Sequence, residues 1–332
     1  MSMEKTDALV VKSVEFMESS LILTLFTRKF GKVRGLAKGA RRLKNPFETS
    51  LDLLASIKLS FIRKNSDALD LLTEAKLARR FRPTARNFRG LYAGYYVAEL
   101  LDLATEDYQP LPDLWTLADA TLDSLQRRPG VAARVAAFET ATLDYLGEFP
   151  STRACVECGQ ALPLDSMTNL ARGIWFELDA GGVVCAKCRQ TKRLPGLIPS
   201  TIGALKLLET GRRAAHAIIS NAYALERLTS ALDERRRDAR VFATELADLR
   251  AAARDDRDAQ DSRALAEYEA APSAARGDYR ALVERYLVRT LRRRPRAFDY
   301  LRFALGEPRD EGAQAERNDA DAQARQTEGA NV

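Results

Sequence analysis

Short apolar runs dominate the first part of the chain, and their spacing predicts β-strands. Four segments rich in β-branched and aromatic residues follow one another: DALVVKSV at 7–14, SLILTLFT at 20–27, GKVRGLAKG at 31–39 and LASIKLSFI at 54–62. Gly31 lies between the second and third segments, where a hairpin turn needs an unhindered backbone. About five short strands in so short a segment are typical of a small closed barrel such as the OB-fold. An open half-barrel or a ubiquitin-like sheet is the alternative.

The hydrophobic period changes after this region and becomes helical. Three segments with helical spacing come first: LYAGYYVAELLDLA at 91–104, LWTLADATLDSLQRR at 114–128 and VAARVAAFETATLDYLG at 131–147. Gly147 is predicted to end the last of them. Helical spacing resumes at 200–215, with Ser200 as the expected N-cap. A final apolar stripe at 278–305 contains Tyr279, Leu282, Val283, Tyr286 and Leu287, with Arg280, Arg285, Arg289 and Arg292 expected largely off it.

Two further segments differ from both patterns. Residues 233–263 mix Arg, Asp and Glu near charge balance, which predicts a solvated helix or helical hairpin with many ion pairs. Residues 307–332 are polar and lack large apolar side chains, so we expect a disordered tail. The chain is therefore predicted to be an α+β multi-domain protein. Its parts are a barrel at 1–80, a helical domain at 81–150 and 196–306, an insertion at 151–195 and the tail.

The four cysteines form two pairs, CVEC at 155–158 and CAKC at 185–188. Two residues between cysteines allow both thiolates of a pair to reach one ion, and two pairs complete a tetrahedral shell. The 26 residues between the pairs exceed the commonest spacing, but WFELDAGGVVC at 175–185 resembles the strand and glycine turn of a zinc ribbon. A redox role for one pair leaves the other unexplained. We predict a structural Zn²⁺ site formed by Cys155, Cys158, Cys185 and Cys188.

Charge adds a second candidate site. The net charge is +6 and the pI is about 9.1, which favours acidic partners. The stretch RKFGKVRGLAKGARRLKN at 28–45 has no acidic residue and holds eight cations: Arg28, Lys29, Lys32, Arg34, Lys38, Arg41, Arg42 and Lys44. A solvated face normally contains acids that limit self-repulsion, so we predict phosphate contacts that are independent of base sequence. The alternative to phosphate binding is a loop that is basic by chance and binds no ligand. Phe26, Phe30 and Phe47 are possible stacking platforms, although such residues more often belong to a core.

Catalytic and membrane signatures are missing from the sequence. His216 is the only histidine and lies in a predicted helix, and neither a GxxxxGK[ST] loop nor a GxGxxG after a strand occurs. We therefore predict a protein that is not an enzyme. Without a long apolar run or a secretion signal, we expect a cytoplasmic protein with no membrane partner, in which the thiols stay reduced.

Taken in order, these features resemble the RecO family of bacterial recombination mediators. The likeness covers most of residues 5–305 and is densest in FGKVRGLAKGARRLKN and in CVECG…FELDAGGVVCAKC. It implies an N-terminal OB-fold, a helical domain and a zinc-binding insertion that some members have lost. Lys38, Arg41, Arg42 and Lys44 match the family's basic segment, and the four cysteines match its metal ligands. Residues 233–263 and the tail exceed the usual length.

The resemblance also implies a function. Family members bind single- and double-stranded DNA, anneal complementary strands, and work with a RecR-type mediator and the single-strand-binding protein to load the RecA recombinase. Such a protein would be nucleoid-associated. The acidic tail of the single-strand-binding protein would need a basic-rimmed apolar groove, for which the candidates are Arg79, Arg80, Arg82, Arg212 and Arg213. An OB-fold RNA-binding or ribosome-associated protein and a protein–protein adaptor are the alternatives.

Overall fold

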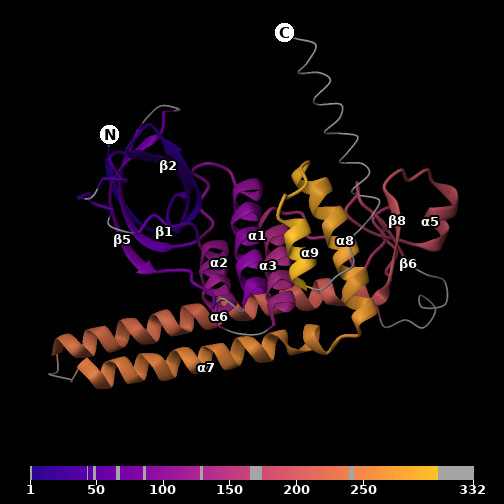
Figure 1. Cartoon of the computed structure of the whole chain (residues 1–332). Helices are drawn as coiled ribbons and strands as arrows, with labels where there is room; N and C mark the ends of the chain where they lie inside the picture. The colour runs from indigo at the N-terminus through magenta and orange to yellow at the C-terminus, as the bar shows by residue number, and fades with distance from the viewer. Residues whose placement is uncertain are drawn as a thin grey trace, which may run out of the picture.

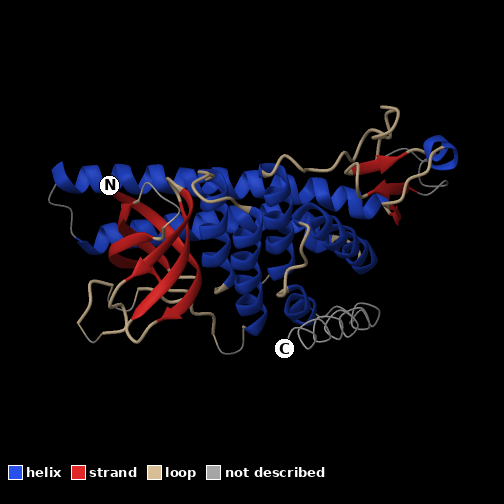
Figure 2. Cartoon of the chain, turned by 90° about the horizontal axis from the view of Figure 1, so that it is seen from above, coloured by secondary structure: helices blue, strands red, loops and turns tan. Residues whose placement is uncertain are grey.

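The computed structural model describes residues 2–42, 44–47, 50–64, 68–84, 87–127, 130–164, 174–238 and 243–305. The N-terminal strands form a barrel at one end of an elongated molecule, helices occupy the middle, and a small sheet with the cysteines lies at the other end (Figures 1 and 2). The predicted tail at 307–332 lies outside these ranges. No helix within them is long and apolar enough to cross a bilayer.

Five strands make the closed barrel: β1 (Ser2–Phe16), β2 (Ser20–Thr27), β3 (Gly31–Ala37), β4 (Ser56–Arg63) and β5 (Asp70–Arg79). The strand order is β1-β2-β3-β5-β4. The long β1 closes the barrel because its first half pairs with β4 and its second half with β2. β3 and β5 are parallel. Alternating residues such as Leu23, Leu25 and Val33 fill the interior. The predicted OB-fold is confirmed.

The helical part packs against one side of this barrel. It contains α1 (Phe88–Ala104), α2 (Pro112–Leu125), α3 (Val131–Tyr145), α8 (Ser273–Leu291) and α9 (Phe298–Leu305). α3 is buried almost throughout because its faces carry small residues such as Ala133, Ala136 and Ala137, which allow close neighbours on several sides. Gly147 follows α3 with φ +74°, the left-handed conformation expected of a helix-ending glycine.

A long helical hairpin runs beneath the other helices and extends below the barrel (Figure 1). It consists of α6 (Ile202–Asp238) and α7 (Ala243–Ala270), which confirms the predicted hairpin. The expectation that the whole segment is solvated was wrong, because Arg257, Asp258 and Asp261 are all at most 9% exposed. They turn inward where α7 packs against α2 and α3.

Two local predictions were also wrong. Ser200 belongs to strand β8 (Leu197–Ser200), and it is the next residue that caps α6, since Thr201 Oγ1 accepts a hydrogen bond from the Ala204 N–H at 3.1 Å. On α8 the apolar stripe is buried as expected, but Arg280 is buried with it. Its guanidinium donates to both oxygens of the buried Glu139 at 2.7 and 2.5 Å. A buried carboxylate on α3 therefore draws the arginine into the core.

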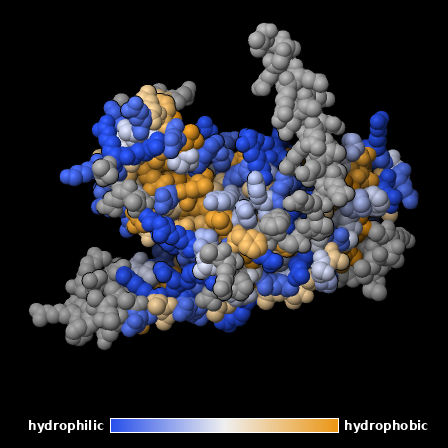
Figure 3. Space-filling view, viewed as in Figure 1, coloured by the Kyte–Doolittle hydropathy of each residue, from blue (hydrophilic) through white to orange (hydrophobic). Residues whose placement is uncertain are grey.

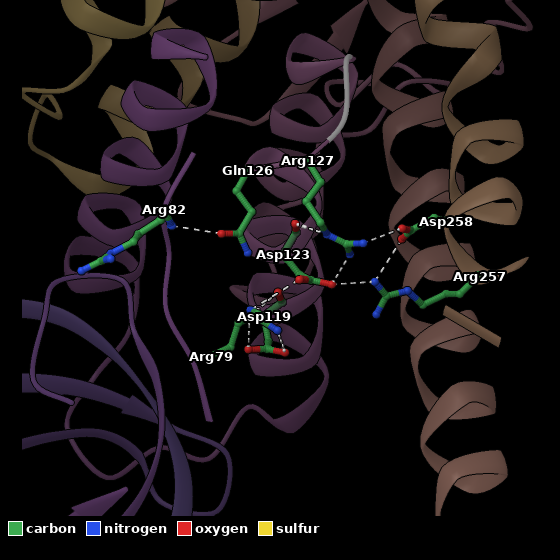
Figure 4. A network of polar contacts seen from close by, with 8 residues as sticks. All are labelled: Arg79, Arg82, Asp119, Asp123, Gln126, Arg127, Arg257 and Asp258. Atoms are coloured by element: carbon green, nitrogen blue, oxygen red, sulfur yellow. Dashed lines mark hydrogen bonds and ion pairs between the residues drawn. The ribbon is translucent and has the colours of Figure 1, made fainter. Parts of the chain in front are cut away.

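An ionic network centred on the buried Asp123 joins the barrel, α2 and α7 (Figure 4). Arg79 at the end of β5 donates to Asp119 of α2 at 2.6 Å. One turn later on α2, Asp123 accepts hydrogen bonds from Arg127 at 2.5 Å and from Arg257 of α7 at 2.9 Å. Three segments far apart in sequence thus share one set of charges, which fixes the barrel on the helices.

The cysteine module, which we define as residues 151–164 and 174–200, is a small unit of its own. β6 (Ile174–Glu177) lies between β7 (Gly182–Val184) and β8 in a three-stranded antiparallel sheet, and the short helix α5 (Ala186–Thr191) follows β7. Phe176 on β6 packs edge-to-face on Tyr286 of α8, which attaches the module to the helical core.

Candidate metal centre and nucleic-acid interface

The structure brings the four cysteines together. Cys155, Cys185 and Cys188 are buried, Cys158 is exposed, and the four Sγ atoms all lie within 4.8 Å of one another. Two knuckles position them. In the first, the Gly159 N–H donates to the Cys155 carbonyl at 2.8 Å, and Gly159 has φ +72°. In the second, Cys185 precedes α5, and its sulfur accepts from the Cys188 N–H at 3.4 Å.

This arrangement fits a tetrahedral zinc ion. Zn–S bonds of about 2.3 Å in a tetrahedron place the sulfurs about 3.8 Å apart, and Cys158 Sγ lies 3.8 Å from Cys185 Sγ. Backbone donors favour the thiolate form of one of these cysteines. Burial opposes ionisation of Cys155, but N–H groups of Cys185, Glu157 and Cys158 outweigh it and lower its pKa to about 7. Four thiolates leave no open coordination position, so an ion held here would cross-link the two knuckles.

The structure divides the predicted basic stretch between two ends of the barrel. β3 spans seven residues, or about 23 Å, and it separates the turn at 28–30 from the loop after residue 37. The first end faces the helices and the second faces away from them. The eight cations therefore do not form one surface, although they are close in sequence.

At the end that faces the helices, carboxylates from other elements neutralise the cations. Arg28 forms a bidentate pair with Glu226 of α6 at 2.6 and 2.7 Å. Lys32 is buried and donates to the Asp102 carbonyl at 2.7 Å, and burial lowers its pKa despite the nearby Asp102 and Asp107 carboxylates. Arg34 pairs with Asp107 at 3.3 Å. Although the stretch itself contains no acidic residue, the fold brings carboxylates from other segments next to these cations.

At the other end lies what we call the basic loop, residues 38–47. Lys38, Arg41, Arg42 and Lys44 are exposed, and only Arg41 among them has an ion pair within the described parts of the chain, with Glu15 at 2.8 Å. The loop is held at both ends. The Arg41 N–H donates to the Ser19 carbonyl in the β1–β2 turn at 2.9 Å, and Asn45 accepts from the Phe47 N–H at 2.8 Å.

The aromatic candidates belong to the barrel. Phe26 and Phe47 are 0% and 1% exposed, so neither offers a face to a base. Phe47 closes the barrel interior at the end of the basic loop. Phe30 is half-buried and packs edge-to-face on Phe61. What the basic loop offers a ligand is therefore charge.

A separate pocket of about 520 Å³ lies in the helical part, between the ends of α1, α2, α3 and α7. Arg89, Arg276 and Glu269 line it together with the apolar side chains of Val131 and Leu305. Arg127 also lines it but is already paired with Asp123 and Asp258. Of the arginines proposed from sequence for an acidic tail, Arg82 lies beside this pocket, because its N–H donates to the lining residue Gln126 at 3.0 Å. The other four do not line it. Arg79 and Arg80 pair with Asp119 and Asp52, and Arg212 and Arg213 with Asp144 and Glu267. The pocket's arginines went unnoticed because they are scattered in sequence.

Comparisons with known proteins agree with this architecture. The family profile described as "Recombination protein O N terminal" matches residues 1–81, and "Recombination protein O C terminal" matches residues 85–237. Among curated relatives, "DNA repair protein RecO" of Rhodopirellula baltica is 43% identical over 185 residues, covering 56% of this chain and 67% of the relative.

Two further relatives carry the same name. That of Desulfitobacterium hafniense is 30% identical over 197 residues, covering 59% of this chain and 68% of the relative. That of Symbiobacterium thermophilum is 30% identical over 264 residues, covering 76% of this chain and all of the relative. With the barrel, the helical part and the cysteine cluster in the same order, the chain belongs to the RecO family of DNA repair proteins.

Proposed function

We propose that this protein is a non-enzymatic recombination mediator that binds single- and double-stranded DNA, anneals complementary strands and helps load a RecA-type recombinase. The observation that carries the proposal is the basic loop, where Lys38, Arg42 and Lys44 project without an ion pair in the described parts of the chain. Family membership supports a role in DNA repair. The eight-cation site of the sequence prediction is reduced to the basic loop and Lys29, because Arg28, Lys32 and Arg34 serve the contact with the helices.

The mechanism is electrostatic. Two complementary strands repel each other through their phosphates, and a cationic surface that neutralises both lowers that barrier. Lysine and arginine contacts to phosphate release counterions and do not read sequence, as annealing of arbitrary strands requires. Because the basic loop offers no aromatic face, the bases of a bound strand stay free to pair.

Protein partners would use the helical part. A RecR-type mediator and the single-strand-binding protein are the partners that we infer. For the acidic tail of the latter, the pocket supplies the exposed cation Arg89 together with Arg276 and the apolar side chains of Val131 and Leu305. The cysteine module would hold structural Zn²⁺, and the protein would act in the cytoplasm at the nucleoid.

Annealing of complementary oligonucleotides coated with the single-strand-binding protein tests the proposal. We expect the wild-type chain to accelerate duplex formation and Lys38→Glu/Arg42→Glu to lose at least about tenfold of that acceleration, since two phosphate contacts are removed. Arg254→Glu/Arg263→Glu is the matched control, because both arginines are exposed on α7 and the charge change is equal. Equal losses in both double variants would contradict the proposal.

Two further arms separate the alternatives. A single-strand-binding protein without its acidic tail should reduce the acceleration, and Arg89→Glu should reproduce that loss. Single-stranded RNA of the same length distinguishes an RNA-binding protein, which would prefer RNA over DNA by a wide margin.

A further inference from the structure

A second acid-free stretch begins in the cysteine module and is as long as the one that contains the basic loop. No Asp or Glu occurs between Asp179 and Glu209, while Lys187, Arg189, Lys192 and Arg193 fall within that interval. All four are exposed. They gather on α5 and the turn that follows it, because the second CxxC knuckle folds the chain sharply at this point.

Unlike Arg28, Lys32 and Arg34 in the first stretch, these four cations are mostly free of ion pairs in the part of the chain that the structure describes. Among the residues that the structure describes, no carboxylate pairs with Lys187, Arg189 or Arg193, and only Lys192 has a partner, Glu157 at 2.6 Å. The module's other acids face elsewhere, since Glu177 accepts a hydrogen bond from the Gly196 N–H and Asp179 pairs with Arg289 of α8.

One of these cations is held in place by an aromatic ring. The Arg189 guanidinium lies 3.6 Å from the centre of the Trp175 ring on β6. An arginine held on an aromatic face has its N–H groups oriented in advance, so less side-chain entropy is lost when it binds a phosphate. Trp175 itself is half-buried against the cysteine cluster. The site is therefore built on the sheet that packs against the cysteine cluster.

The module patch, meaning Lys187, Arg189, Lys192 and Arg193, is far from the barrel. Both views place the module and the barrel at opposite ends of the molecule (Figures 1 and 2), and the surface at the outer tip of the module is hydrophilic (Figure 3). α6 links the two ends, beginning beside the module at Ile202 and reaching the barrel at Glu226. That distance along the helix is about 36 Å, and the basic loop lies farther away, at the other end of the barrel.

We propose that the cysteine module carries a second DNA-binding surface, in which Lys187, Arg189 and Arg193 contact the phosphate backbone. This goes beyond the proposed function, which places DNA on the barrel alone. A molecule with cationic surfaces at both ends can hold one long strand along its length or one strand at each end, and the second arrangement brings two strands together on one protein. The competing explanation is that these cations only balance the charge of four thiolates.

The test compares double charge reversals in the full-length chain. Lys187→Glu/Arg193→Glu changes the patch and spares Arg189, whose contact with Trp175 supports the sheet. Binding to a single strand of about 40 nucleotides, followed by fluorescence anisotropy, should weaken about tenfold, and the slope of log Kd against log salt should fall by about 1.4 because two contacts are lost. Arg254→Glu/Arg263→Glu should leave both quantities near wild type.

Metal content and melting temperature of the same variants show whether the module is intact. Unchanged metal content with weakened DNA binding supports the second surface. Easier loss of metal to a chelator with unchanged DNA binding overturns it and favours charge balance. DNA binding no weaker than that of the α7 control pair also overturns it.

The result is separable from that for the barrel. In the Lys38→Glu/Arg42→Glu background, residual DNA binding should depend on Lys187 and Arg193. If the barrel reversal has no effect and the module reversal does, the proposed function fails and this inference stands. The opposite result leaves the barrel as the DNA-binding surface and removes the second one.

Discussion

Arg28 of the barrel and Glu226 of α6 form a bidentate ion pair, with N–O distances of 2.6 and 2.7 Å. The guanidinium also lies within 6 Å of the ring centres of Trp115 and Tyr223. Its hydrogen bond with Glu226 raises the pKa of Arg28, and the same bond lowers the pKa of Glu226. The first cation of the basic stretch thus fastens the barrel to the long hairpin.

Arg28 and its neighbour Lys29 should therefore respond differently to substitution. Arg28→Ala removes the ion pair and the ring contacts, so the free energy of unfolding should fall by about 1–2 kcal/mol. Lys29→Ala removes an exposed side chain, so stability should stay within about 0.5 kcal/mol. Urea denaturation of both variants measures this difference. A larger loss for Lys29→Ala would disprove these assignments.

Gly31 should tolerate no side chain. Its φ is +69°, and a Cβ atom would lie 1.9 Å from the Gln109 carbonyl oxygen, in the segment that connects α1 and α2. Gly31→Ala should cost several kcal/mol of stability, as severe core disruptions do, because the added Cβ atom would clash with backbone atoms that cannot move aside. Gly39→Ala is the control. Its φ of +72° carries strain, but only the flexible Arg42 side chain is near, so about 1 kcal/mol is expected. Thermal unfolding should rank the two variants in that order.

The buried carboxylate of Asp123 should be essential to the network in Figure 4. Asp123→Asn leaves Arg79, Arg127 and Arg257 short of a partner, and breaking such a buried pair costs about 3–5 kcal/mol. Asp52→Asn is the matched control, since Asp52 pairs with Arg80 on the exposed surface and should contribute less than about 1 kcal/mol. Similar melting temperatures for the two variants would contradict a structural role for the network.

The same group predicts a pH dependence. Burial opposes ionisation of Asp123, but Arg79, Arg127 and Arg257 outweigh burial and hold its pKa below the ordinary value. A lowered pKa in the folded state gives stability that is present above the unfolded pKa of about 3.9 and is lost as the pH falls through the folded value. The stability difference between wild type and Asp123→Asn should therefore shrink below about pH 4. A constant difference would exclude this carboxylate as the source.

Removing the metal should unfold the module and spare the barrel. Apart from three cysteines, Val184 is the only fully buried residue of the cluster around the sulfurs in the described part of the module, so little apolar burial holds the knuckles without an ion. Chelation or Cys155→Ser should speed hydrogen exchange at 174–200. Exchange in β1–β5 serves as the internal control and should not change. Slow exchange in the module after complete metal removal would show that it folds without an ion.

Sequence patterns predicted the elements well because each pattern is local. Each of these features depends on residues within a few positions. Examples are the side chains of β2 that point inward at Leu23 and Leu25, the glycine that ends α3, and the two CxxC pairs. The cysteine cluster followed from spacing alone. Such features can be predicted without knowing which helices and strands pack together.

The basic stretch shows where this reasoning stops. By its sequence Lys32 is a surface cation. In the fold, β3 lies beside the end of α1 and the segment after it, which bring Asp102 and Asp107 to Lys32 from some 70 residues away. Glu226 reaches Arg28 across an even longer separation. Absence of acids along a sequence therefore does not predict absence of acids in space. The second acid-free stretch, after Asp179, was overlooked because the cysteines accounted for that region.

The salt dependence of DNA binding tests the central claim, that the basic loop contacts phosphates. For a single strand, each lost contact lowers the slope of log Kd against log salt by about 0.7. Lys38→Ala/Arg42→Ala should therefore lower it by about 1.4 relative to wild type, while Arg254→Ala/Arg263→Ala leaves it unchanged. A slope equal to that of wild type in the loop variant would mean that DNA does not touch this loop.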